Sequence, residues 1–326
     1  MLKISTAPHL NSPLSTRGIM GHVIIAMLPL AFMSIAYFGI SALEVIITSV
    51  AGCVLFEYLI SRYLMKVPNS TRDLSAVVTG LLLAFNLPAG MPIWMTLVGC
   101  LIAIGVAKMA FGGIGKNLFN PALVGRVFLF ISFPVQMTHW IKPDLFHFMN
   151  LDAQTAATPL GILKHMDALS TVSQHHLPQY WEMFVGYTGG SLGEVSTAAI
   201  LLGFIYMLWK KIIGWEIPVY YIGTFLIFIG IHWLLTGETR YEPMTHILSG
   251  GLMLGAVFMA TDYTTSPMTR RGRIIFAIGC GFLTYIIRIY SVYPEGVSFA
   301  ILIMNAFVPL IDMTCIPRVF GSKERK

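Results

Sequence analysis

Charged residues are scarce in this chain of 326 residues: 21 are basic and 15 are acidic, together 11% of the sequence. Soluble domains usually have about 25%, and a soluble protein of this size could not cover its surface with so few charges. Hydrophobic residues make up 56%, and the mean hydropathy is +0.74. This composition excludes a soluble fold and a disordered chain, and it predicts a polytopic membrane protein.

Cysteine and metal-ligand patterns are also scarce. The four cysteines lie far apart without a CxxC pair, so the chain itself supports neither a zinc site nor an iron–sulfur cluster. No two of the nine histidines share a predicted span at haem or metal spacing, so we assign no metal ligands. The net charge of +6 comes from short basic clusters between apolar runs. That distribution indicates membrane topology and no nucleic-acid partner.

Long apolar runs make up most of the sequence. A helix needs about 20 apolar residues to cross the hydrocarbon core of a bilayer, with 17–25 usual. Ten apolar segments reach or nearly reach this length: 19–39, 43–64, 73–88, 92–111, 117–134, 193–209, 217–236, 246–261, 273–290 and 297–313. We therefore expect an all-α membrane protein with about ten transmembrane helices.

The one long polar stretch divides these segments into two sets of five. We expect a cytoplasmic N-terminal tail (1–18), a first membrane half (19–134), an extracytoplasmic loop (135–192), a second membrane half (193–313) and a cytoplasmic C-terminal tail (314–326). Because five is odd, the second half must run inverted relative to the first, which is a common transporter design.

Basic residues indicate the orientation. With ten spans, sixteen of them fall on the side of the termini, whereas only Lys142, Lys164, Arg240 and Arg288 fall on the other side and Arg126 lies within a span. Since basic residues accumulate in cytoplasmic loops, the termini are predicted to be cytoplasmic and the loop to face outward.

Two segments in corresponding positions, 73–88 and 246–261, are short and end in irregular polar sequence. A matched pair of short, interrupted segments indicates a central binding site. Ordinary short helices close to the membrane normal explain the pattern equally well, so both interpretations stay open.

The outer loop contains a candidate helix start. Thr158 followed by Pro159 is typical of an N-cap residue with proline at the first helical position. A helix start also offers free N–H groups and a positive dipole end, where a phosphate would be stabilised.

The run around Thr158 resembles the flavinylation motif Ser/Thr-Gly-Ala-Thr of a family of respiratory membrane subunits. This family includes the D subunit of the Rnf ion-translocating electron transport complex and the B subunit of the sodium-translocating NADH:quinone reductase. Three more runs resemble signatures of the family: Ala7–His9 with Ser15–Met20, Gly112–Ala122, and Ala260–Pro267 with Gly272. The resemblance covers nearly the whole chain, and the chain length is closer to that of the Rnf members.

The resemblance implies that FMN is bound covalently to Thr158 through a phosphoester, with Thr155 opening the motif and Ala157 inside it. Ala156 stands where the family usually has glycine, and its methyl group would hinder entry to the flavin transferase. The family's threonine-linked flavin faces outward, in agreement with the predicted orientation. A second, non-covalent flavin inside the bundle and partner subunits of an Rnf-type complex are further implications.

Three polar residues of the predicted spans are candidates for an ion path or an intramembrane ion pair. Arg126 lies near the middle of a span, where an arginine costs roughly 2.5–3.5 kcal/mol on insertion scales. Glu57 is either its counter-charge, which we favour because unpaired charges in lipid are rare, or it faces a cation path. Asp262 follows a short segment and would bind Na⁺ or orient a flavin; a local turn capped by its carboxylate explains it equally well.

We therefore expect a membrane subunit of an ion-translocating oxidoreductase complex of the ferredoxin:NAD type, located in the bacterial cytoplasmic membrane. It would carry electrons on FMN, would not be catalytic alone, and would couple electron transfer to movement of Na⁺ or H⁺. The alternative is a non-redox secondary transporter or channel built from inverted repeats. The motif from Thr155 to Thr158 discriminates between the two.

Overall fold

The computed structural model describes residues 15–66, 70–145, 155–164, 178–291, 293 and 295–316. Most of both predicted tails, the run at Ala7–His9 and the middle of the predicted outer loop lie outside these residues. Within the part that is described, the secondary structure is helical throughout, and the one extended pairing is an isolated antiparallel bridge between Ile141 and Thr155.

Helices occupy all ten ranges that the sequence predicts. The first half comprises α1 (Thr16–Leu59), η1 (Ile60–Leu64), η2 (Ser70–Asp73), α2 (Ser75–Phe85), α3 (Ile93–Leu101), η3 (Ile102–Met109) and α4 (Pro121–Ser132). Short helices α5 (Pro134–Met137), α6 (Pro159–Lys164) and α8 (Tyr180–Val185) follow. The second half comprises α9 (Thr197–Trp209), α10 (Glu216–Thr236), η4 (Thr239–Tyr241), α11 (Pro243–Leu248), α12 (Leu252–Leu254), η5 (Gly255–Met259), α13 (Arg270–Tyr290) and α14 (Val297–Thr314).

The length and apolarity of these helices confirm an all-α membrane protein. Among the described residues, four helices are long and apolar enough to cross a membrane: the run Thr16–Leu64, α10, α13 and α14. Shorter apolar helices lie at α2, α3 with η3, α4 and α9. The run Thr16–Leu64 holds the first two predicted spans, because the backbone at Gly39 is non-helical (φ 63°, ψ −140°) and kinks it.

The predicted segment 246–261 is not one helix. It is broken at Ser249–Gly251, between α11 and α12, and Gly250 has φ 70°. In its counterpart 73–88, Leu74 (φ 64°) separates η2 from α2, but it lies at the start of the segment, and α2 is continuous from Ser75 to Phe85. The segment 246–261 is therefore an interrupted helix, whereas the segment 73–88 is one short helix with a left-handed residue at its start.

Polar residues at the helix starts define several boundaries. The side chains of Ser15, Asn120, Ser196 and Thr269 each accept a hydrogen bond from a backbone N–H in the first turn of α1, α4, α9 and α13. Such caps satisfy N–H groups that have no partner inside the helix.

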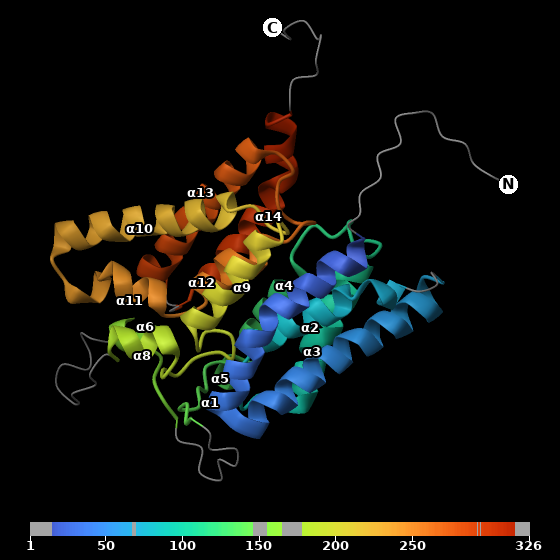
Figure 1. Cartoon of the computed structure of the whole chain (residues 1–326), viewed down its shortest axis with the longest axis horizontal. Helices are drawn as coiled ribbons and strands as arrows, with labels where there is room; N and C mark the ends of the chain where they lie inside the picture. Colours follow the sequence, from blue (N-terminus) through green and yellow to red (C-terminus); the bar gives the residue numbers. More distant parts are fainter. Residues whose placement is uncertain are drawn as a thin grey trace, which may run out of the picture.

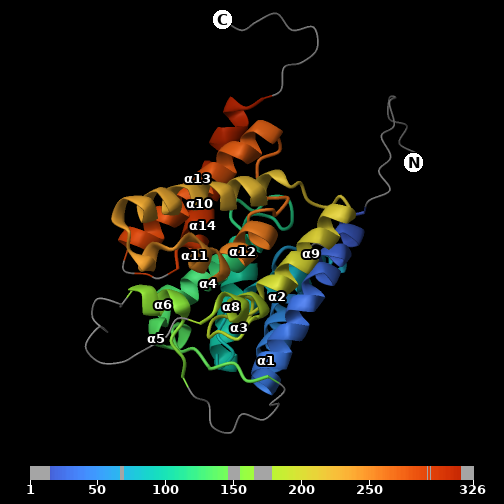
Figure 2. The ribbon, with the colours of Figure 1, turned by 60° about the vertical axis from the view of Figure 1, so that its left-hand side comes forward.

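Two groups of helices form the molecule, and α9 lies beside α1 although the two are far apart in the sequence (Figures 1 and 2). Helix α4 packs against α2, α3 and η3 of the first half and against α14 of the second. It is thus in contact with both halves, and the two main cavities lie near its opposite ends.

Candidate functional site

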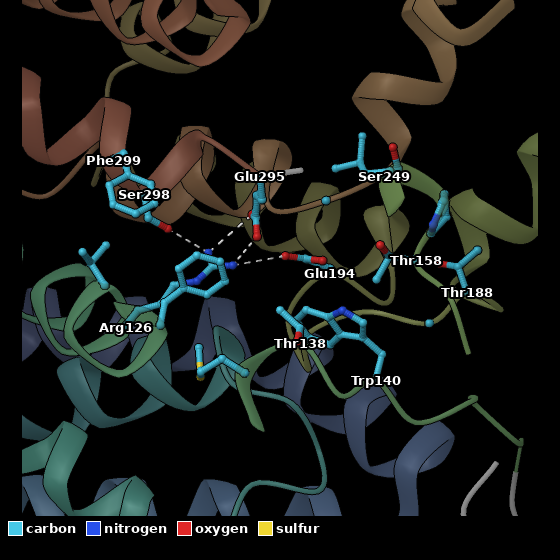
Figure 3. Close-up of a pocket in the computed structure, with 17 residues that line it drawn as sticks. Arg126, Thr138, Trp140, Thr158, Thr188, Glu194, Ser249, Glu295, Ser298 and Phe299 are labelled. Carbon is cyan, nitrogen blue, oxygen red and sulfur yellow. Dashed lines mark hydrogen bonds and ion pairs between the residues drawn. The ribbon is translucent and has the colours of Figure 1, made fainter. Parts of the chain in front are cut away.

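The first cavity contains the threonine that the sequence singles out. Its empty volume is about 780 Å³ including the open mouth. Residues from α4, α5, α6, α14 and the connecting segments line it, among them Arg126, Trp140, Thr158, Glu194 and Glu295 (Figure 3).

Thr158 caps α6, as predicted. Its Oγ1 accepts a hydrogen bond from the N–H of Gly161 at 3.1 Å, and its carbonyl accepts one from Ile162 at 2.9 Å. The preceding residues are held by the segment before them, since the N–H of Ala156 donates to the carbonyl of Trp140 at 3.0 Å. Thr158 is therefore fixed at the cavity wall by backbone contacts on both sides.

Ala156 packs against a glycine. A Cβ added to Gly189 would lie 3.1 Å from the Cβ of Ala156, closer than ordinary contact. The methyl group that distinguishes Ala156 from the usual glycine therefore faces Gly189, which leaves room for it.

Arg126 joins the two halves of the chain inside this cavity. Its guanidinium forms an ion pair with Glu295, lies 3.7 Å from Oε1 of Glu194, and donates to Asn86 Oδ1 at 2.8 Å and Ser298 Oγ at 2.9 Å. The Arg126 side chain is 8% exposed. In Figure 3, Thr158 lies on the other side of Glu194 from Arg126.

The two carboxylates belong to the candidate site, and the sequence alone does not predict them. Glu194 and Glu295 each lie just before a helix, α9 and α14, and their side chains are 9% and 15% exposed. Glu295 also accepts from the N–H of Gly251 at the broken helix, at 2.8 Å. The only signal in the sequence is that both acids stand at the ends of predicted spans on the outer side, where few charges occur.

The expected pair of Glu57 with Arg126 is wrong. Glu57 is fully buried and pairs with Lys108 at 2.5 Å, and it accepts a hydrogen bond from Ser70 at 2.7 Å. Lys108 is one of the sixteen basic residues that the charge count assigns to the cytoplasmic side, but it is 2% exposed and also donates to Ser75 at 2.6 Å. Both Glu57 and Arg126 are paired, each with a partner that lies far from it in the sequence.

A second cavity, of about 720 Å³ including its mouth, lies near the other end of α4. Asp262 lines it, and its Oδ2 accepts from the hydroxyl groups of Thr264 at 3.0 Å and Thr265 at 3.2 Å. Asn117 donates to Thr264 at 3.0 Å. Burial raises the pKa of Asp262 above its usual value, against these hydrogen bonds. The structure thus brings together two of the predicted signatures, Gly112–Ala122 and Ala260–Pro267.

The two cavities separate the candidate residues into two chemical environments. Near Thr158, aromatic walls surround one buried cation and two carboxylates, an arrangement that can hold a flat ring and influence its charge. Near Asp262, a carboxylate lies beside two threonine hydroxyl groups, and oxygen atoms of these kinds are ligands of hard cations. The candidate residues Thr158 and Arg126 share a cavity, whereas Asp262 and Glu57 lie apart from it.

Comparison with known proteins gives matches along almost the whole chain. The model of the NQR2, RnfD, RnfE family matches residues 3–321. The chain is 45% identical over 323 residues to the D subunit of the proton-translocating ferredoxin:NAD(+) oxidoreductase complex of Clostridium ljungdahlii, covering 98% of this chain and 96% of that protein. It is 44% identical over 322 residues to the D subunit of the Na(+)-translocating ferredoxin:NAD(+) oxidoreductase complex of Acetobacterium woodii, covering 98% and 95%. The D subunit of the ion-translocating oxidoreductase complex of Stutzerimonas stutzeri is 39% identical, covering 95% and 94%.

Proposed function

Because the chain belongs to the NQR2, RnfD, RnfE family, we propose that it is the membrane subunit of an ion-translocating oxidoreductase complex of the ferredoxin:NAD type. It carries FMN through a phosphoester on Thr158 and exchanges electrons with other subunits of the complex, which moves Na⁺ or H⁺ across the bacterial cytoplasmic membrane. The observation that carries this proposal is the position of Thr158 on the wall of a cavity that also holds the buried Arg126.

The residues around Thr158 fit a flavin. Trp140, Phe130 and Phe299 provide flat apolar surface along the wall of the cavity, and ligand pockets are lined mainly by such apolar and aromatic side chains. When bound, the isoalloxazine would accept and release electrons, while the protein supplies position and polarity. Thr158 provides the point of attachment, and the aromatic side chains orient the ring and exclude water from it.

The charged residues of this cavity act on any charge that the flavin gains. Arg126 favours an added electron, because electrostatic interactions are stronger in a buried site than in water. Glu194 and Glu295 oppose it and hold Arg126 in place. The balance of these three groups is expected to determine how easily the flavin is reduced.

The experiment is detection of covalent flavin on the protein expressed with its flavin transferase. On a denaturing gel under ultraviolet light, the wild-type chain should fluoresce at its mass of 36.1 kDa, and Thr158→Ala should abolish the band. Thr188→Ala is the matched control, because Thr188 lines the same cavity outside the motif. Ala156→Gly should raise the fraction modified if the methyl group slows the transferase.

Absence of fluorescence in the wild type, or fluorescence that survives Thr158→Ala, would contradict the flavin assignment and favour the non-redox transporter.

A second, non-covalent flavin is proposed for the cavity near Asp262, which is comparably large. The amount of flavin that acid releases from the Thr158→Ala protein would measure this second flavin separately from the covalent one.

The ion path is proposed to pass Asp262. Its carboxylate lies with threonine hydroxyls at a cavity, whereas the carboxylate of Glu57 is neutralised by Lys108. Asp262→Asn should lower ion transport in vesicles while electron transfer continues. Glu57→Gln tests the alternative, and full transport by both variants would exclude this path. The relatives are named for both ions, Na⁺ and H⁺, so transport should be measured with each.

A further inference from the structure

Three of the four basic residues on the predicted outer side surround one cavity. Lys164 from α6, Arg240 from η4 and Arg288 from α13 line a third cavity of about 570 Å³ including its mouth. Lys142, the fourth, is exposed and does not line it. Basic residues are rare on this side, so the clustering of three of them around one cavity indicates that the cavity has a function.

The lining of this cavity is cationic. Among the described residues, no carboxylate lines it, and the other lining residues include His246 and Tyr241. Glu238 forms an ion pair with Arg240 at 2.5 Å, but its side chain is 49% exposed and lies outside the lining. The remaining cations bind backbone carbonyls: Lys164 donates to the carbonyl of Tyr293 at 2.8 Å, and Arg288 donates to that of His246 at 2.6 Å.

Two buried nitrogen atoms of this lining have no hydrogen-bond partner among the described residues. They are Nε of Arg288 and Nδ1 of His246, whose residues are 4% and 5% exposed. A buried polar atom without a partner is costly, and most such atoms in folded proteins are satisfied by protein, water or a ligand. Arg288 Nε is a donor, which an anion would satisfy, whereas His246 Nδ1 is the acceptor of the neutral ring, because Nε2 donates to the carbonyl of Arg240; water or a phosphate hydroxyl would satisfy it. Both atoms therefore indicate that a polar group belongs in this cavity.

The side chains around the cavity are of the kinds found at the depth of lipid headgroups. Tyr241 packs against His232 with ring centroids 4.2 Å apart, and Tyr290 stands beside them on α13. The nearby end of α10 exposes Leu234 and Leu235. Aromatic rings beside exposed leucines are typical of the membrane–water interface.

We propose that this cavity, lined by Lys164, Arg240, His246 and Arg288, binds a phosphate-bearing anion on the outer face of the membrane. The shared chemistry is a phosphate group facing several cations, and its source is an anionic phospholipid headgroup or free phosphate. Basic pockets between transmembrane helices bind lipid headgroups by this chemistry. The site is independent of the flavin proposal, because Thr158 lies in a different cavity, although Leu160 of α6 borders both.

The test uses the full chain in nanodiscs of phosphatidylcholine, with or without phosphatidylglycerol, and in phosphatidylcholine nanodiscs with added inorganic phosphate. The unfolding temperature and the lipid retained in native mass spectrometry are measured for the wild type, Arg240→Gln and Lys164→Gln. Lys142→Gln is the matched control: it removes an outer cation that does not line the cavity. Because Lys164 also binds carbonyls of the fold, each variant is compared with itself across the three conditions.

We expect phosphatidylglycerol to raise the unfolding temperature of the wild type and of Lys142→Gln. Each cavity variant should bind phosphatidylglycerol about tenfold more weakly than the wild type. If inorganic phosphate raises the unfolding temperature equally, and this rise is lost in the same variants, the result supports the site with free phosphate as its ligand. Absence of protection by either anion, or an equal loss in Lys142→Gln, would overturn the proposal.

Discussion

At the scale of single residues, Arg126 is a buried cation that contacts both halves of the chain. It lies among carboxylates and polar groups that come from the end of α2, the segment before α9 and the start of α14. A buried ion pair contributes little net stability, but removal of one partner leaves an uncompensated buried charge. For the stability of the fold, Arg126 is therefore needed chiefly because Glu194 and Glu295 are buried beside it.

This reasoning gives a prediction for Arg126→Gln. The variant should lower the free energy of unfolding by about 3–5 kcal/mol, because two buried carboxylates lose their cation. The measurement is reversible unfolding in detergent micelles. Adding Glu295→Gln to the same chain should recover part of the loss. If the double variant loses as much as the two single variants together, the charges do not interact as described.

Arg126 shows which properties of a buried charge the sequence predicts. The sequence identifies Arg126 as a buried charge in need of a counter-charge, since its position within an apolar run is enough for that. It does not identify the partner, because Glu295 lies 169 positions away and only the packing of α14 against α4 brings it close. The pair of Glu57 and Lys108 escapes notice for the same reason.

At the scale of elements, the ten helical ranges follow directly from hydrophobic length, and the cap at Thr158 follows from its residue type. The break in the segment 246–261 does not. Ser249-Gly250-Gly251 is compatible with a continuous apolar helix, and the break depends on contacts with other segments, such as the bond from the Gly251 N–H to Glu295. The cavity near Thr158 needs this break, because Ser249 and Gly250 form part of its wall.

Gly250→Ala tests the break. Gly250 has φ 70°, and a Cβ there would lie 2.5 Å from Cδ1 of Leu160 and 2.9 Å from Nη2 of Arg288. We expect a loss of roughly 1–2 kcal/mol from the left-handed backbone alone, and more from the contact with α6. Gly223→Ala in α10 is the control, because its added Cβ meets nothing within 4 Å and alanine favours a helix by about 1 kcal/mol. The unfolding temperature should fall for Gly250→Ala and rise for Gly223→Ala.

At the scale of the whole molecule, the scarcity of charge and its placement have separate consequences. Scarcity makes lipid the main solvent of the chain. Placement predicts which side each loop faces, and the structure adds that the two large cavities lie near opposite ends of α4. A flavin on Thr158 and an ion at Asp262 would therefore act near opposite faces of the membrane, so coupling between them must pass along α4 and the helices packed on it.

The orientation itself is predicted from sixteen basic residues against four, and it can be tested with cysteine labelling. Cys53, Cys100 and Cys280 are buried, so replacing the partly exposed Cys315 by serine gives a background with little reactivity. Lys142→Cys and Arg271→Cys then place one exposed thiol on each predicted side. In intact cells, a membrane-impermeant maleimide should label Lys142→Cys alone, and Arg271→Cys should react only after the membrane is opened. The reverse pattern would invert the topology and place Thr158 inside, where an outward-facing flavin could not be attached.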